Sequence, residues 1–496
     1  MSTIPPVGAA PVSDPRRWRA LSVLAFMQFM LILDITVVNV ALPSMKVSLG
    51  FSEANLAWVV DAYVLIAGGF LLLGGRAADL LGRRRIFLSG AAIFALASLT
   101  SGLAQNQFQL IASRAAQGLG EALAAPAALA MVVTLFADPK ERARALGIWG
   151  GLAGLGGTLG VVLSGVITQL TSWRWIFLIN LPIALVVLIV VPRVIPPDRP
   201  RSTGGIDIAG AVLITGGITA LVYALLEANN NGWLSLITLG LFGLSALMIV
   251  TFLLVESKVR RPLIRLGFFR QRRPTVASGL VVVIGSAFFA MFFLLTLYMQ
   301  QVLGYSPLKA GLAYLTFGGA ILIGFGSASQ LLPRIGVRPL MVTGMMLTGI
   351  GLLYLARLPV DGSYWADLAP AMVVIAFGSG WCFVSLSVTA VSESGEQEAG
   401  LASGVLNTAQ QIGGALGLAV LISVATSRTA SLLAEGQSPL AAQVGGSHVA
   451  FGIGAALVFS GAAIAALLIG QFIPESLPVP MPITDQPLEP VVPPSS

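Results

Sequence analysis

Fourteen apolar runs of membrane-spanning length dominate this chain of 496 residues and constrain its fold more than any other feature. Lipid offers no hydrogen-bond partners to the backbone, so runs of this length must be helices, because barrel strands would be about half as long and would alternate in polarity. Apolar residues make up 56% of the chain and charged residues 10%, which excludes an ordinary soluble domain. We therefore expect an all-α integral membrane protein with 14 transmembrane helices. They begin near Trp18, Asn55, Ile86, Phe108, Arg144, Trp173, Ile206, Trp233, Val276, Leu308, Pro339, Leu368, Gly400 and Val449.

The basic residues are concentrated on one side of the predicted membrane. Of 28 Lys and Arg, all but six lie in the N-terminal segment and in or beside the loops that follow even-numbered runs. Such residues stay in the cytoplasm, so we expect a multi-pass protein of the cell (inner) membrane with both termini cytoplasmic. The same topology explains the net charge of +7, including the basic stretch from Lys258 to Arg273, and nucleic acid is not an expected partner.

The sequence is duplicated. Gly156 and Gly160 in the fifth run match Gly413 and Gly417 in the thirteenth, at an offset of 257 residues. Adding this offset to the start of the first run places the second half near residue 275, and two facing six-helix bundles are typical of transporters. The predicted organisation is a disordered cytoplasmic N-terminus (1–15), an N-terminal six-helix bundle (16–196), two inserted transmembrane helices (197–257), a basic cytoplasmic loop (258–274), a C-terminal six-helix bundle (275–473) and a disordered Pro-rich cytoplasmic tail (474–496).

A charged loop separates the second and third runs and reads Gly75-Arg-Ala-Ala-Asp79-Leu-Leu-Gly82-Arg83-Arg84-Arg85. Gly82 permits a tight turn, and the arginines after it lie at the lipid headgroups. A weaker copy occurs 254 residues later, in which Gly336 repeats Gly82 and Pro333 replaces the aspartate. A topological role explains this loop on its residues alone.

Three ionisable residues lie deep within predicted helices, where a charge is costly and is a functional candidate by default. At a rise of about 1.5 Å per residue, Asp34 lies about 13 Å below the outer end of its run, and Asp61 and Arg114 lie about 10 Å below the ends of theirs. The three therefore share one layer. Asp34 is either the main proton carrier or the permanent partner of Arg114 in an ion pair that fixes packing. Asp61 either attracts a cationic substrate near the external mouth or faces water.

Glu121 is the deepest acid of the first half. It lies seven residues after Arg114, two helical turns on and on the same face, so both residues face a cavity if either does. It is a candidate for a second proton site, for a carboxylate that binds cationic substrates, or for a structural partner of a neighbouring helix.

Polar and aromatic side chains in the second half are candidates for substrate binding. Gln301, Asn407 and Gln411 lie in apolar runs, where amides need either a watery cavity or hydrogen bonds to other helices. Tyr298 has a ring that can stack on a planar cation. Four phenylalanines nearby either form an apolar binding wall or, as we favour, face lipid. They are Phe288, Phe289, Phe292 and Phe293.

Five segments occur in a specific order along the chain. They are Leu33-Asp34-Ile-Thr36-Val-Val-Asn39-Val-Ala-Leu-Pro43, the loop from Gly75 to Arg85, Arg114-Ala-Ala-Gln117-Gly118-Leu-Gly120, Trp173-Arg174-Trp175-Ile-Phe177-Leu-Ile-Asn180-Leu-Pro182 and Tyr298-Met-Gln300-Gln301-Val-Leu-Gly304-Tyr305-Ser306-Pro307. With this set the chain resembles the major facilitator superfamily, specifically its fourteen-helix drug:proton antiporters.

The resemblance implies proton-coupled efflux of amphipathic, often cationic drugs or antibiotics across the cytoplasmic membrane by alternating access. It implies that Asp34 and Arg114 take part in proton coupling and that Asp79 latches the bundles against the thirteenth helix. The loop before that helix carries acids that we expect to oppose the arginines from Arg83 to Arg85, Arg84 among them. They are Glu393, Glu396 and Glu398. The implied partners are the lipid bilayer, a drug-like small molecule and protons, for a monomer that needs no cofactor besides the proton gradient.

Two observations bear on alternative functions. The glycines of the fifth run, Gly156 and Gly160 among them, permit close approach of another helix, but the family's antiporter signature would put Pro at Val161 and Gly at Ser164. A proton-coupled metabolite symporter of the same fold is therefore the alternative. Enzymatic activity and a metal site are not expected, because His448 is the only histidine and the chain has neither an HExxH motif nor a Walker loop.

Overall fold

The computed structural model describes residues 17–136, 138–196, 207–259, 262, 271–392 and 399–471, and every regular element within these ranges is a helix. Thirteen helical segments of this part are long and apolar enough to cross a membrane, and α5 (Pro139–Leu170) fills the remaining place in the order. The expected all-α membrane fold with 14 transmembrane helices is confirmed. The predicted disordered ends, 1–15 and 474–496, lie outside the described residues.

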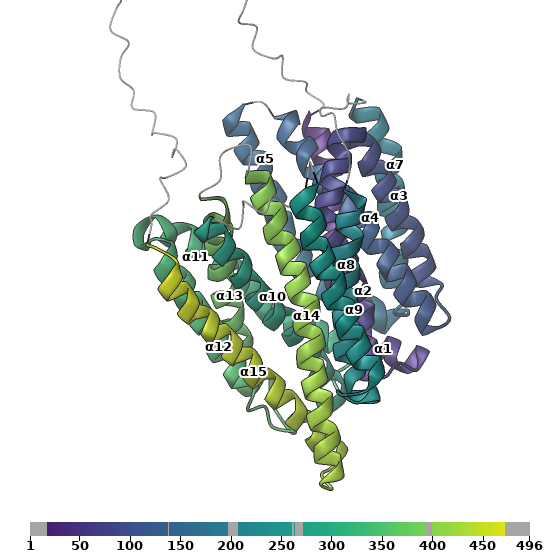
Figure 1. The fold of residues 1–496 in the computed structure, drawn as a ribbon, viewed down its shortest axis with the longest axis vertical. Helices are drawn as coiled ribbons and strands as arrows, with labels where there is room; N and C mark the ends of the chain where they lie inside the picture. Colours follow the sequence, from purple (N-terminus) through teal and green to yellow (C-terminus); the bar gives the residue numbers. More distant parts are fainter. Residues whose placement is uncertain are drawn as a thin grey trace, which may run out of the picture.

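Figure 1 shows the first half of the chain, in purple and blue, beside the second half, in green and yellow. The first half contains α1 (Arg17–Leu49), α2 (Glu53–Leu81), α3 (Arg83–Gly102), α4 (Gln107–Leu135), α5, and the consecutive helices α6 (Trp175–Leu178) and α7 (Asn180–Val194). The inserted helices are α8 (Ile208–Asn231) and α9 (Leu236–Lys258). The second half contains α10 (Arg272–Leu297) with its π-helical extension η2 (Tyr298–Val302), α11 (Pro307–Ile335), α12 (Val337–Leu355), η3 (Tyr364–Leu368) continued by α13 (Ala369–Val391), α14 (Ala399–Ala434) and α15 (Pro439–Leu468).

Short polar side chains fix where many of the helices begin. Ser52, Asn106 and Ser306 each accept a hydrogen bond from the backbone N–H three residues on, which satisfies a donor that the helix leaves free. Ser438 caps α15 in the same way, and proline follows it at the first helical position. Because of this cap, α15 begins well before Val449, so the predicted start of the fourteenth helix is wrong.

Two glycines turn the chain between consecutive helices. Gly82 has a φ of 100° between α2 and α3, and Gly336 has a φ of 80° between α11 and α12. Residues other than glycine rarely adopt this backbone conformation. The same turn is therefore built twice, at positions that the sequence repeat relates.

The two halves pack their helices in the same pairs. In the first half, α2 and α3 lie against α4, and α1 lies against α5; in the second half, α11 and α12 lie against α13, and α10 lies against α14. Two further pairs join the halves, α2 with α14 and α5 with α11, and the repeat relates these pairs to each other. The result is two six-helix bundles with corresponding internal contacts.

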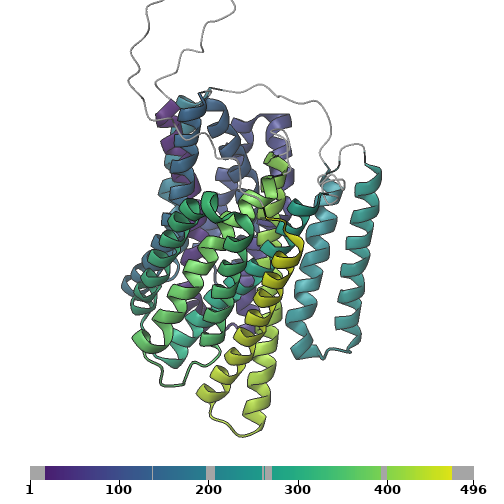
Figure 2. The same ribbon diagram turned by 90° about the vertical axis from the view of Figure 1, so that its left-hand side faces the viewer.

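The inserted helices α8 and α9 form a hairpin at the side of the two bundles (Figure 2). α8 packs against α2 and α14, one helix from each bundle, whereas α9 packs mainly on α8. Asp207 caps α8 by accepting a hydrogen bond from the N–H of Gly210 at 2.8 Å. The hairpin therefore lies over the seam between the bundles on one side of the molecule.

The glycine stripe of α5 packs directly on α1. A Cβ on Gly156 would lie 3.1 Å from Cγ2 of Ile32, and a Cβ on Gly160 would lie 3.1 Å from the carbonyl oxygen of Leu33 and would overlap the Thr36 hydroxyl. The absence of side chains at these two positions lets the helix backbones approach closely.

Gly160→Val should destabilise the protein by about 1–3 kcal/mol, because the added side chain would overlap Thr36 and the backbone of α1. Gly157→Val is the matched control, since a Cβ on Gly157 meets no described atom within 4 Å. Thermal unfolding of both variants in detergent micelles measures the difference. Equal melting temperatures for the two variants would contradict this account of the α1–α5 contact.

Candidate functional site

A buried ion pair joins α1 to α4 inside the first bundle. Nη1 of Arg114 donates a hydrogen bond to Oδ2 of Asp34 at 2.5 Å, and the two side chains are only 1% and 0% exposed. The other carboxylate oxygen, Oδ1, accepts from the amides of Asn180 at 2.7 Å and Gln117 at 3.2 Å. The structure therefore contains the ion pair that is one of the two roles expected of Asp34, and proton transfer by Asp34 stays a prediction.

Arg114 connects α4 to three neighbouring segments. Its Nε donates to the carbonyl oxygen of Val59 in α2 at 2.9 Å. Its guanidinium carbon lies 4.2 Å from the ring centroid of Tyr63 in α2 and 5.7 Å from that of Phe177 in α6. A planar guanidinium is suited to such stacking as well as to the carboxylate of α1. Asp34 and Arg114 lie at the level of residues 59 to 63 of α2, as their predicted depth requires.

Sequence reasoning misses two members of this network, Gln117 and Asn180. Gln117 accepts from Nη1 of Arg114 at 2.9 Å and donates to the hydroxyl of Ser98 in α3 at 2.8 Å. The sequence contains a feature that could have identified each of these amides. Gln117 lies one helical turn after Arg114 on the same face, and Asn180 interrupts an apolar run, where an amide needs a partner.

Two further acids of the first bundle are buried without a complete set of hydrogen bonds. Asp61 of α2 is fully buried, and neither of its carboxylate oxygens has a hydrogen-bond partner within the described residues. Glu121 of α4 is 7% exposed, and its Oε2 has no such partner there either. Burial of a carboxyl group without partners is costly, so both positions are candidates for function. Asp61 is buried and does not face water in this structure, and its attraction of a cationic substrate stays a prediction.

Tyr298 and Gln301 make hydrogen bonds inside the second bundle. The hydroxyl of Tyr298 donates to the carbonyl oxygen of Pro359 at 2.6 Å, and Oε1 of Gln301 accepts from Nε2 of Gln443 in α15 at 2.6 Å. In this structure both side chains therefore act as contacts between helices and loops of one bundle.

Asn407 and Gln411 lie on the face of α14 that meets α2. A Cβ built on Gly68 of α2 would lie 2.6 Å from the Cβ of Gln411. A Cβ built on Gly404 of α14 would lie 2.6 Å from Cδ2 of Leu72 in α2. Asn407 is exposed and lies between Gly404 and Gln411 at helical spacing, so it shares their face. The two amides are thus positioned at the seam between the bundles.

The phenylalanines of α10 form an aromatic cluster inside the second bundle. The ring centroid of Phe288 lies 5.0 Å from that of Phe292 and 5.7 Å from that of Phe383 in α13. Phe292 stacks on Tyr314 of α11 at 5.0 Å, and Phe293 is 1% exposed. The expectation that these rings face lipid is wrong, because Phe288 and Phe292 pack on rings of α11 and α13, Phe289 lies against α14, and Phe293 is buried.

The charged loop between α2 and α3 contacts α4 within the first bundle. Asp79 accepts from Nη2 of Arg83 at 3.0 Å, and Arg83 also donates to a backbone carbonyl of α4 at 3.1 Å. Gly82 makes the turn, Arg84 is half-buried in the first turn of α3, and Gly75 lies against a proline of α4. The acids expected to oppose Arg84 lie outside the described residues, namely Glu393, Glu396 and Glu398. The latch of Asp79 on the thirteenth helix stays a prediction.

Hydrogen bonds and a close backbone contact join the two bundles at the end of the molecule opposite to the start of α1 and the end of α15. Nε2 of Gln300, in η2, donates to the carbonyl oxygen of Val40 in α1 at 2.8 Å. The N–H of Leu308, at the start of α11, donates to Oε1 of Gln169 in α5 at 3.1 Å. A Cβ on Gly165 of α5 would lie 2.6 Å from a carbonyl oxygen of α11. These contacts close the seam at this end.

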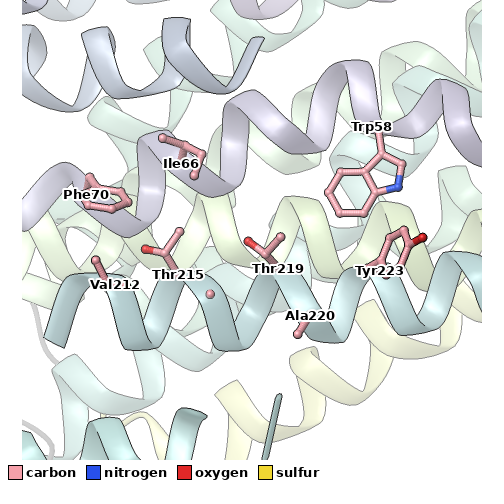
Figure 3. Close-up of a pocket in the computed structure, with 9 residues that line it drawn as sticks. Trp58, Ile66, Phe70, Val212, Thr215, Thr219, Ala220 and Tyr223 are labelled. Carbon is pink, nitrogen blue, oxygen red and sulfur yellow. The ribbon is translucent and has the colours of Figure 1, made fainter. Parts of the chain in front are cut away.

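A cavity of about 450 Å³ lies between α2 and α8, on the side of the molecule (Figure 3). Trp58 and Tyr223 lie at one end with ring centroids 5.9 Å apart, and Phe70 and Val212 lie toward the other. Thr215 is buried between them, and its hydroxyl has no hydrogen-bond partner in the described part of the chain. No residue of the buried ion network lines this cavity.

Comparison with known proteins gives concordant matches. Residues 24–418 match the family model described as Major Facilitator Superfamily. The chain is 41% identical to the puromycin resistance protein pur8 of Streptomyces alboniger, over 92% of this chain and 94% of the relative. It is 38% identical to the cephamycin export protein CmcT of Amycolatopsis lactamdurans, over 84% of this chain and 86% of the relative. The crystal structure of the POT family transporter PepTSo matches with a TM-score of 0.65 at 14% sequence identity, over 91% of this chain and 97% of that chain, which supports the fold alone.

Gln300→Leu should shift the protein toward a state in which the bundles separate at this end, because it removes the donor that joins η2 to α1 across the bundles. A hydrogen bond of this kind contributes about 0.5–1.5 kcal/mol. Distances between spin labels at the end of α1 and the start of α11 should lengthen in this variant. Gln301→Leu is the control, since Gln301 bonds within its own bundle. Unchanged distances for Gln300→Leu would show that this contact does not hold the seam.

Proposed function

Because this chain belongs to the major facilitator superfamily, we propose that it exports drug-like compounds, antibiotics among them, across the cell membrane by alternating access. The observation that carries the proposal is the similarity, over most of the chain, to a resistance protein and an export protein. The hydrogen bonds that join the two bundles at one end of the molecule support it, because alternating access requires the bundles to touch at one end while they separate at the other.

Proton exchange is the proposed energy source, with Asp34 as the main carrier and Arg114 as its coupled partner. Asp34 accepts hydrogen bonds from three side chains on α4 and α7. Protonation would remove the negative charge of its carboxylate and so weaken these hydrogen bonds. Arg114 also binds a carbonyl of α2, and α2 meets the second bundle at α14. These contacts form a physical route by which proton binding could bias the position of one bundle against the other.

Amphipathic and often cationic compounds are the proposed substrates. Asp61 and Glu121 are buried acids in which both oxygens of Asp61 and Oε2 of Glu121 lack hydrogen-bond partners in the described residues, and a cation would offset that cost. The aromatic cluster around Phe288 supplies apolar area of the kind that planar or amphipathic compounds bind. Asn407 and Gln411, at the seam between the bundles, are proposed to contribute polar contacts.

The proposed location is the cell (inner) membrane, with both termini in the cytoplasm and the protein as a monomer. The chain is a multi-pass membrane protein, and the asymmetric distribution of Lys and Arg supports this orientation. The proton gradient is proposed to supply the energy without a cofactor.

A proton-coupled metabolite symporter is the second candidate. The observation that favours it is Val161 and Ser164 in α5, at positions where the resembled antiporters carry Pro and Gly. The Ser164 hydroxyl donates to the carbonyl oxygen of Val37 in α1, so the substitution has a packing role as well. Flux in vesicles under an imposed pH gradient separates the two candidates, since a symporter moves its substrate along with protons and an antiporter moves it against them.

Asp34→Asn should abolish proton-coupled export, because an amide cannot bind and release a proton in transport. The measurement is export of a fluorescent cationic dye from cells and proton release by the purified protein when dye is added. Full export by this variant would end the carrier role of Asp34.

A second variant separates proton transfer from packing. Asp34→Asn alone leaves the buried charge of Arg114 without its counter-charge, which costs about 3–5 kcal/mol. The double variant Asp34→Asn/Arg114→Gln should recover much of the lost thermal stability while export stays absent. Export that returns together with stability would assign the pair a purely structural role.

Glu121→Gln should reduce export of cationic compounds more than export of neutral ones, because it removes a buried negative charge that attracts the cation. Transport rates for matched cationic and neutral dyes measure the effect. Glu435→Gln, an exposed acid paired with Arg428, is the control. Equal losses for both dye classes would point to a packing role for Glu121.

A further inference from the structure

A second lateral cavity, of about 430 Å³, lies where the inserted hairpin meets both bundles. Its walls come from α2, α8, α9, α10 and α14. A volume of this size is within the range of ligand pockets and exceeds the small voids of a close-packed interior. The hairpin accounts for the space, because α9 packs mainly on α8 and stands away from α10 and α14 (Figure 2).

The lining of this cavity is almost entirely apolar. Thr275 and Ser278 of α10 are among its polar residues, but their hydroxyls donate back to carbonyls of their own helix at 2.7 and 2.8 Å. Thr408 of α14 has a buried hydroxyl with no partner in the described part of the chain. Phe252 of α9 forms part of the cavity wall on the side of the hairpin. Such a wall suits a hydrocarbon chain and leaves at most one hydroxyl for a polar group.

Positive charge gathers at one end of the cavity. Lys258 ends α9 and Arg272 begins α10, and both side chains are exposed. Lys258 lies about 8 Å along the helix axis beyond Leu253, and Arg272 lies about 5 Å before Thr275, so both flank the same mouth. The sequence from Lys258 to Arg273 contains seven basic residues and no acid.

The nearby acids point away from this mouth. Glu256 of α9 is buried, and its Oε2 lies 3.1 Å from a Cβ built on Gly210 of α8. Asp207 uses one carboxylate oxygen to cap α8 and turns the other toward the same glycine. Both acids therefore face α8, and neither lines the cavity.

We propose that this cavity binds an acyl chain of an anionic phospholipid, whose phosphate lies between Lys258 and Arg272. Basic groups beside an apolar pocket between membrane helices are the chemistry that recognises such lipids. The bound chain fills the space between α9, α10 and α14 and lies beside Leu72, where α2 meets α14. The lipid thus holds the hairpin against the seam of the two bundles.

Native mass spectrometry of the purified full-length protein, offered equal amounts of phosphatidylglycerol and phosphatidylcholine, tests the proposal. The wild type should retain phosphatidylglycerol in preference through detergent exchange. Gly279→Leu should lose this lipid, because Gly279 lines the cavity and a Cβ there meets no described atom within 4 Å, so the leucine occupies lipid space without a clash. Gly319→Leu is the matched control on α11, since Gly319 is also exposed with no described atom near its Cβ position.

The headgroup is tested separately. Lys258→Gln/Arg272→Gln should keep a bound lipid but lose the preference for phosphatidylglycerol, by about fivefold per removed charge. Equal retention of phosphatidylglycerol by Gly279→Leu and Gly319→Leu would overturn the site. Equal binding of both lipids by the wild type, or an undiminished preference in the double variant, would overturn the assignment of an anionic headgroup. No transport is measured, so the outcome does not depend on the proposed function.

Discussion

The positive charge of Arg114, buried in the first bundle, must be neutralised where water is excluded, and this requirement organises the helices around it. A guanidinium has five N–H donors and cannot be deprotonated in proteins, so its partners must come from the protein. They come from the carboxylate of Asp34 in α1, a carbonyl of α2, the amide of Gln117 and aromatic rings of α2 and α6. Asn180 then completes the coordination of the carboxylate from α7. A change in the protonation or charge of this pair would therefore alter contacts with most helices of the first bundle.

The two bundles share an architecture but differ in chemistry. Within the described residues, the buried Asp, Glu and Arg side chains belong to α1, α2, α4 and α9, and none belongs to α10 through α15. The second bundle has at its centre the aromatic cluster of Phe288, Phe292 and Tyr314 instead. Duplication therefore preserved the packing of helix pairs, while the interior positions diverged toward charge in one half and aromatic rings in the other. Such a division suits a protein in which one half responds to protons and the other offers apolar area.

Depth in the membrane could be predicted from this sequence, whereas direction around a helix axis could not. The helices, the duplicated turn at Gly82 and Gly336 and the common layer of Asp34 and Arg114 follow from spacing and charge alone. The direction in which Phe288 or Gln301 points does not, because helices in lipid are apolar on all sides and lack the polar face that marks solvent on a soluble helix. The start of α15 is hidden for a related reason, since its first turns carry polar residues such as Gln443 that hydropathy assigns to a loop.

The π-helical turn η2 contains two adjacent glutamines that bind different partners. Its defining hydrogen bond runs from the N–H of Leu303 to the carbonyl of Tyr298, which adds one residue to the turn and rotates the helix end by about 100° relative to a regular helix. Consecutive side chains on a helix point about 100° apart, so Gln300 reaches α1 of the opposite bundle while Gln301 reaches α15 of its own. The boundary between contacts that must break during a transport cycle and contacts that must persist falls between these two consecutive side chains.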